Sequence, residues 1–198
     1  MILCEFDTDK ALKQISKALG DNGDKAAAVL ASAATATAKE CRKMLATKAQ
    51  ETYAVRNAGF NKVMKIQNAS KRKPYAMITA QGKAMELINF KTNPAKVAEE
   101  PPEVVKAKVL KINSLKRLEK DGIKAFIVKF QSGHTTIAER KGQARLPIRT
   151  LYSHGVTRML GDEKRVYGLI APEVQQMLLD QAYKQIDKRL AKAAKEAS

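Results

Sequence analysis

A long run without glycine or proline, residues 24–55, constrains the fold of this chain more than any other feature. Leu30, Ala34, Cys41 and Leu45 recur in it at helical spacing, and most of the remaining stripe is alanine. Small side chains allow a second element to approach a helix closely. We therefore expect a long helix packed on a sheet, with a specific seam between subunits as the less favoured alternative.

A shorter amphipathic helix is expected before this run. Thr8 can cap it, Leu12, Ile15 and Leu19 fall on one face, and Gly20 provides a stop. The two helices together account for residues 1–56.

The C-terminal part of the chain, residues 151–198, is also predicted to be helical. Residues 154–160 give one or two turns, and residues 171–197 form a long helix with Pro172 at an N-terminal position. The apolar residues of the long helix lie on one stripe, namely Val174, Leu178, Ala182, Ile186 and Leu190.

The middle of the chain, residues 61–150, has the alternating pattern of antiparallel strands. A hairpin is expected on either side of Lys71, Arg72 and Lys73, and residues 83–92 fit either a third strand or a helical turn. Residues 104–112 resume strand character. Residues 125–130 and 134–140 form a further hairpin.

Residues 92–103 are rich in proline and acidic residues and read as an excursion from the sheet rather than a domain boundary. The chain is therefore predicted to be a single domain, 1–198. Its expected class is α+β, with an antiparallel sheet of about four to six strands and a long N-terminal and a long C-terminal helix packed on it.

The positive charge is concentrated in this β-rich middle. The chain carries a formal charge of +17 with a pI near 9.9. Residues 61–149 hold 20 Lys and Arg against 7 Asp and Glu, whereas residues 1–60 hold 9 against 7. Self-repulsion on this scale indicates a polyanion or an acidic protein as partner. Aromatic residues are only 5% of the chain, which argues against a single-strand binder that stacks bases.

No arrangement of residues supports catalysis, so we expect no enzymatic activity, cofactor or metal. His134 and His154 are the only histidines, and neither sits in a nucleophile–base arrangement. The acidic residues are scattered among lysines, and Cys4 and Cys41 have no metal-type spacing. No apolar run is long enough to span a bilayer, so no membrane partner is expected.

One stretch, residues 123–160, resembles the C-terminal half of the minor tail protein Z family of tailed phages and prophages. Its strand ends in Ala125-Phe126-Ile127, and Ser132-Gly133-His134 and Arg140-x-Gly142 follow. The remaining matched residues, in chain order, are Arg145, Leu146, Pro147, Ile148, Leu151, Met159 and Leu160.

The resemblance implies a tail completion protein, a structural subunit of the virion at the junction of tail and neck. Such a subunit would be synthesised in the bacterial host cytoplasm and would form a ring, a hexamer if it matches the six-fold symmetry of the tail. Its partners would be copies of itself, the tail terminator or tail tube protein and the head–tail connector proteins. Passing or paused double-stranded DNA would be a further, non-specific partner. The alternative is a non-specific DNA-binding protein that acts through its basic surface alone.

Within the matched stretch, the residues divide into structural and interacting sets. Ser132-Gly133 is expected to turn a hairpin, Gly142 to allow a second turn, and Pro147 to end strand character before the helix. With Phe126, His134, Leu146 and Ile148 these are the structural residues of the motif. The residues expected to contact other subunits, a neighbouring ring or DNA are Lys65, Lys71, Arg72, Lys73, Arg140, Lys141, Arg145 and Arg149.

Overall fold

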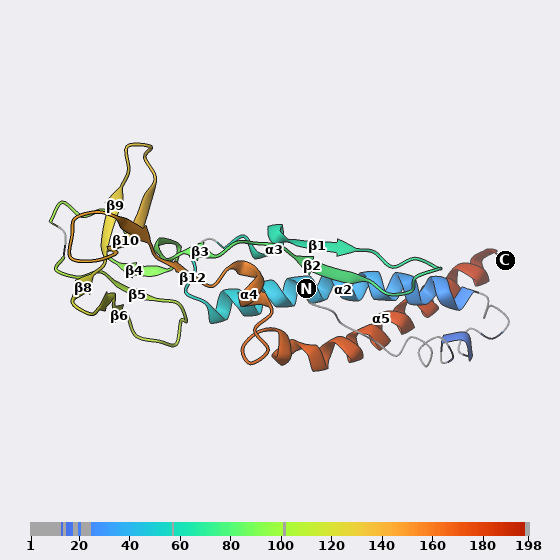
Figure 1. The fold of residues 1–198 in the computed structure, drawn as a ribbon. Coiled ribbons are helices and arrows are strands. Elements are labelled where there is room, and N and C mark those ends of the chain that lie inside the picture. Colours follow the sequence, from blue (N-terminus) through green and yellow to red (C-terminus); the bar gives the residue numbers. More distant parts are fainter. Residues whose placement is uncertain are drawn as a thin grey trace. The chain divides into compact units, whose positions relative to one another are not determined.

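The computed structural model describes Lys13, residues 15–17, Gly20 and residues 25–56, 58–100 and 102–196. It has a mixed α+β fold with antiparallel strands and a long helix toward each end, which confirms the predicted class (Figure 1). The strands divide among several small sheets of two or three strands. Thr8, Leu12 and Leu19 of the predicted first helix lie outside the described residues.

The contacts of the chain divide it into two compact units. Unit 1 comprises Met1–Thr47, Asn61–Gln81 and Gly161–Ser198. Unit 2 comprises Lys48–Phe60 and Gly82–Leu160. Each unit draws on segments that are far apart in the sequence, so neither is a contiguous domain. The single domain expected over residues 1–198 stays a prediction.

Unit 1 is built around helix α2 (Ala26–Thr52), which begins in this unit and continues into unit 2. Figure 1 shows the hairpin of β1 (Met64–Gln67) and β2 (Met77–Ala80) and helix α5 (Tyr167–Glu196) running alongside it. A short helix, α3 (Phe60–Val63), leads into β1. The hairpin around Lys71 is thus confirmed, with Met64 opposite Ala80 and Gln67 opposite Met77.

The core of unit 1 is formed by one face of α2 and one face of α5. The α2 face carries Ala26, Val29, Leu30, Ala33 and Ala34, which recur every three or four residues as an amphipathic helix requires. They pack with Ile15 and with Leu178, Ala182 and Ile186 of α5. The predicted stripes are therefore buried, except that Leu190 is 42% exposed.

The start of α5 also differs from the prediction. The helix begins at Tyr167, so Pro172 lies inside it rather than at its N-terminus. Asp162 lies in the turn before this start. Its Oδ1 accepts hydrogen bonds of 3.0 Å from the backbone N–H groups of Lys164 and Arg165. An aspartate in this role satisfies backbone donors before the first full turn.

The described residues of unit 2 form four of the small sheets. One three-stranded sheet consists of β9 (Phe126–Lys129), β10 (Thr135–Arg140) and β11 (Ile148–Thr150), with β10 in the centre. A second three-stranded sheet has the order β4 (Lys91–Asn93), β5 (Lys106–Lys108), β6 (Lys116–Arg117). The remaining elements are β3 (Met85–Glu86) with β12 (Tyr152–Ser153), β7 (Glu119–Lys120) with β8 (Ile123–Lys124), the 3-10 helix η2 (Leu87–Asn89) and α4 (Val156–Leu160).

The segment after α2 holds these pieces of unit 2 together. The N–H of Ala54 donates to the carbonyl of Val109, and the carbonyl of Ala54 accepts from the N–H of Lys91. This segment therefore lies between the chain that leaves β5 and the chain that enters β4. The largest fully buried side chains of the unit include Tyr53, Phe90 and Ile137.

The chain turns between β10 and β11 as predicted, but one prediction about this loop was wrong. Pro147 does not end strand character, because β11 follows it directly and pairs with β10. Its missing N–H costs no ladder bond there, and its carbonyl accepts from the N–H of Lys141. Gly142 has no left-handed φ, and a Cβ at that position would meet nothing within 4 Å, so this turn does not require glycine.

Candidate functional site

The eight basic candidates fall into two groups, one in each unit, and all eight are exposed. Lys65 and the hairpin tip, defined as Lys71, Arg72 and Lys73, belong to unit 1. Arg140, Lys141, Arg145 and Arg149 belong to unit 2. Each group is therefore a separate candidate surface.

The hairpin tip of unit 1 is a tight, anchored loop. The backbone groups of Ser70 and Lys73 exchange hydrogen bonds of 2.8 and 3.1 Å, so Lys71 and Arg72 occupy the two central positions of the turn. The loop is fixed to α2 because the N–H of Ala69 donates to Thr35 Oγ1 at 3.1 Å. The turn thus presents three cations at a defined place.

In unit 2, two of the four basic candidates are engaged by their own unit. Arg149 lies opposite Glu139 across the β10–β11 pair, and its Nε donates to Glu139 Oε1 at 2.6 Å. The guanidinium of Arg140 lies 5.8 Å from the centre of the Phe126 ring, within range of a cation–π contact. Lys141 and Arg145 stand in the exposed loop before β11, and neither side chain has an ionic partner among the described residues.

The hairpin of the family-like motif is formed as the sequence predicts. The N–H of Phe130 donates to the carbonyl of His134, and the N–H of Gly133 donates to the carbonyl of Phe130. Gly133 has a φ of +81°, a conformation that favours glycine. Ser132 Oγ lies 3.5 Å from the N–H of His134. The turn residues therefore have a structural reason to be serine and glycine.

His134 has contacts that the sequence did not predict. Its ring stacks on Phe130 with an interplanar angle of 4°, and its Nε2 lies 3.1 Å from Glu86 Oε2 of β3. The side chain thus ties the β9–β10 hairpin to another sheet of the same unit. This geometry supports the structural role predicted for His134.

The last motif residues line the loop and strand that follow. Leu146 is 67% exposed, which is unusual for a large apolar side chain, and Pro147 is exposed beside it. Ile148 of β11 lies opposite Arg140 of β10, and Phe126 of β9 lies opposite Ala138 of β10. The loop therefore combines an exposed leucine with the two unengaged cations, Lys141 and Arg145.

A second basic surface in unit 2 was not predicted. We define the basic sheet face as Lys91, Asn93, Lys106, Lys108 and Arg117, which share one side of the β4–β5–β6 sheet. Opposed residues of an antiparallel pair point to the same side. Lys91 lies opposite Lys108, and Lys106 lies opposite Arg117. The other side carries the buried Thr92 and Ala107, so the basic side faces outward.

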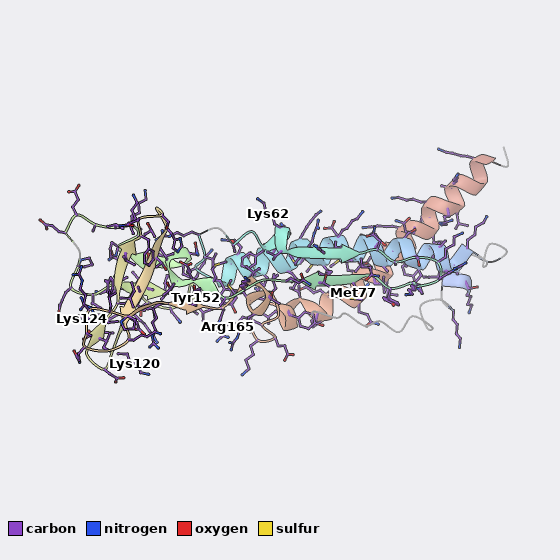
Figure 2. The ribbon with its side chains drawn as sticks, turned by 45° about the horizontal axis from the view of Figure 1, so that its top comes forward. Lys62, Met77, Lys120, Lys124, Tyr152 and Arg165 are labelled. Atoms are coloured by element: carbon purple, nitrogen blue, oxygen red, sulfur yellow. The ribbon has the colours of Figure 1, made fainter. Side chains whose placement is uncertain are left out.

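Acidic residues stand at one edge of this face. Glu103 Oε1 accepts a hydrogen bond of 2.6 Å from Lys124 Nζ, and Glu103 Oε2 lies 4.0 Å from the guanidinium of Arg117. The hydrogen bond from Lys124, then the charges of Lys124 and Arg117, hold the pKa of Glu103 below its ordinary value of 4.5. Glu119 also lies 3.3 Å from Arg117. Figure 2 shows Lys124 and Lys120 on the adjoining β7–β8 hairpin.

Within the described ranges, no cluster of three or more His, Cys, Asp or Glu is suited to a metal ion. A hollow of about 20 Å³ in unit 1 is lined by apolar residues such as Leu30, Leu178 and Tyr183. None of the helices in the part of the chain that the structure describes is long and apolar enough to cross a membrane.

Comparisons with protein-family models, curated proteins and solved structures gave no match. The resemblance to the minor tail protein Z family therefore rests on the sequence motif of residues 123–160 alone.

Proposed function

We propose that this chain is a structural virion protein of a tailed bacteriophage, a tail completion protein at the head-proximal end of the tail. The ordered motif over residues 123–160 carries this proposal. Its residues occupy one continuous part of unit 2, from β9 through β10 and β11 to α4. A motif that spans a whole run of paired strands and a helix is the kind of segment that a shared fold retains.

The loop before β11 supplies the contact that a ring requires. Subunits of a closed ring meet head to tail, so each needs an exposed patch that fits a different patch on its neighbour. Leu146 offers exposed apolar area, and Lys141 and Arg145 offer charge that selects partner and register. We assign this loop to the contact with a neighbouring subunit or ring, and the role is non-catalytic.

Electron microscopy of assembled particles tests the proposal. The chain, carrying a fused density label, should copurify with tails, and the label should lie at the tail end that meets the neck. Tails that lack the chain, or a label at the distal end, would contradict the assignment.

A salt titration tests the role of the loop. Binding to the tail terminator protein should weaken as salt rises, because exposed charge pairs are screened. The double variant Lys141→Glu and Arg145→Glu should bind at least tenfold more weakly, by the roughly 1.4 kcal/mol that separates tenfold steps. The matched control is Lys96→Glu with Lys129→Glu, two exposed lysines of the same unit. Equal losses in both double variants would exclude a specific role for the loop.

The second candidate, a non-specific DNA-binding protein, is favoured by the basic sheet face. Such a protein would shift duplex DNA at low salt without any other protein and would not copurify with tails. The two experiments above therefore separate the candidates.

A further inference from the structure

We propose that the basic sheet face of unit 2 is a contact surface for the phosphate backbone of duplex nucleic acid. The inference depends on the geometry of this sheet and not on the proposed function. Duplex binding in the absence of any tail would therefore leave it intact.

The pairing of the strands concentrates charge on this face. Opposed side chains in an antiparallel sheet have Cβ atoms about 4.5–5.5 Å apart. Lys91 and Lys108 form one such pair, and Lys106 and Arg117 form the next. Lys106 and Lys108 are two residues apart on β5, about 7 Å along the strand. Four cations thus occupy an area on the order of 10 Å across.

The underside of the sheet keeps these cations pointing outward. Thr92 and Ala107 are 6% and 5% exposed, and they alternate with the basic residues along β4 and β5. Thr92 Oγ1 accepts a hydrogen bond of 2.8 Å from the guanidinium of Arg56, which also donates to the carbonyl of Ala95. A one-residue slip of β4 or β5 would turn Lys91, Lys106 and Lys108 to the side of Thr92 and Ala107, which favours the observed register.

The charges on this face are incompletely compensated within the unit. Arg117 has Glu119 and Glu103 nearby, and Lys108 Nζ donates to the carbonyl of Lys111 at 2.7 Å. Lys91 and Lys106 make no ion pair with any described residue. Like charges that lie directly opposite destabilise a sheet. An anion placed between them would relieve this repulsion.

The composition of the face favours phosphate over an acidic protein surface. Protein interfaces are depleted in lysine and enriched in aromatic residues and arginine, whereas this face has three lysines, one arginine and one asparagine. Lysine is a compact point charge suited to phosphate contacts that need no fixed orientation. The face has no aromatic side chain to stack a base, which favours duplex over single-stranded nucleic acid. Binding should therefore be independent of sequence.

The salt dependence of binding to a random-sequence duplex DNA tests this inference. Each neutralised phosphate contributes about 0.9 to the slope of log affinity against log salt. The slope of the triple variant Lys91→Gln, Lys106→Gln and Lys108→Gln should therefore be smaller in magnitude than that of the wild-type protein by about 3. Circular dichroism should show an unchanged fold, since removing opposed like charges does not destabilise the sheet.

Three exposed lysines of unit 1 outside the candidate surfaces, Lys62, Lys184 and Lys188, provide a matched control. Replacing them by glutamine removes the same charge, and the slope should change by less than about 1. Equal loss of slope in both triple variants would show diffuse charge attraction and overturn the inference. Wild-type protein that fails to bind duplex DNA but binds polyglutamate would also overturn it, because the face would then be a protein-docking surface.

A gain of binding gives an independent readout. Glu103→Gln removes the carboxylate that engages Lys124 and Arg117. The variant should bind duplex DNA with a steeper salt slope, by about 1. An unchanged slope would place duplex contact elsewhere and count against the inference.

Discussion

The two units of this chain bury their cores in different ways, and the difference explains where the charge is exposed. Unit 1 uses long helices, in which one face is apolar over many turns and the opposite face carries polar residues. Unit 2 uses strands of at most six residues. On β4 and β5 only one residue per strand is buried, and its neighbours on the strand point outward. Short strands thus place basic residues from different segments of the chain opposite one another across a sheet.

The charge balance follows the same division. Unit 2 contains 18 Lys and Arg against 8 Asp and Glu, and unit 1 contains 19 against 12. Unit 2 therefore carries the larger excess of positive charge. Both units nevertheless present exposed basic residues, at the hairpin tip in unit 1 and on the basic sheet face in unit 2.

The largest effect is expected in the core of unit 1. Leu178→Ala should lower the free energy of unfolding by about 2–5 kcal/mol, because Leu178 is 4% exposed and packs against α2. Leu190→Ala, on the same helix but at an exposed position, should cost less than about 0.5 kcal/mol. Urea unfolding followed by circular dichroism measures both. Similar losses in the two variants would show that α5 is not held by this face.

A close backbone approach in unit 2 gives the next effect. A Cβ at Gly155 would overlap the backbone carbonyl of Lys83. Gly155→Ala should therefore cost about 1–3 kcal/mol, as overpacking does elsewhere. Gly142→Ala is the control, since a Cβ there meets nothing within 4 Å, and it should change thermal stability little. A neutral Gly155→Ala would mean that the segments of Gly155 and Lys83 separate easily.

The pair of Arg149 and Glu139 should contribute a smaller amount. The side chain of Glu139 is 13% exposed and that of Arg149 is 57% exposed, so solvent screens part of the attraction. A double-mutant cycle with Arg149→Gln and Glu139→Gln should give a coupling of about 0.5–1 kcal/mol. Arg149→Gln should leave the salt slope of duplex binding unchanged. A reduced slope would show that Arg149 contacts the duplex.

The basic sheet face should respond in the opposite direction. Lys106→Gln removes repulsion with Arg117 across β5 and β6 and should raise stability by about 0.2–1 kcal/mol. Lys129→Gln, at an exposed position of β9, should have no such effect. Thermal unfolding of the two variants compares them. A loss of stability in Lys106→Gln would show that the lysine packs favourably within the sheet.

The smallest expected effect is the titration of Glu103. Its folded pKa lies below 4.5, so its pairing with Lys124 and Arg117 stabilises the fold above that pH. The contribution is lost as the pH falls through the lowered folded pKa. Carboxyl chemical shifts should show a midpoint below 4.5 that moves upward in Lys124→Ala. Lys120→Ala, on the same hairpin, should leave the midpoint in place. No movement in Lys124→Ala would remove Lys124 as the cause.

Sequence periodicity was enough to predict the elements of unit 1 and the main hairpin of unit 2. Helix α2, helix α5 and the pairs β1–β2 and β9–β10 all follow from local spacing and turn residues. The short helix α4 was also predicted. In each case, the interacting residues are neighbours on one helix or on two strands joined by a short turn. Such patterns are visible in the sequence before any long-range contact is known.

The basic sheet face could not be found in this way. Lys91 and Lys108 belong to strands separated by a long excursion, and each strand alone shows only ordinary alternation. The like-charge pairs can be recognised only once the register of the strands is known. The prediction for Pro147 failed for a related reason. The missing N–H of a proline matters inside a strand ladder, but it does not matter at the position directly before the ladder. The Asp121-Gly122 turn, with both φ angles positive, did have a local signal that indicates a two-residue hairpin.

The interleaving of the two units sets an order in which they can form during translation. Unit 2 ends at Leu160, whereas unit 1 requires Gly161–Ser198. At about 5–20 residues per second, these last residues take about 2–8 s to synthesise. During that interval, the strands of unit 2 can pair while the alanine-rich face of α2 still lacks α5. The nascent chain would thus acquire its cationic surface before its scaffold is complete, at a time when the ribosome itself presents abundant phosphate.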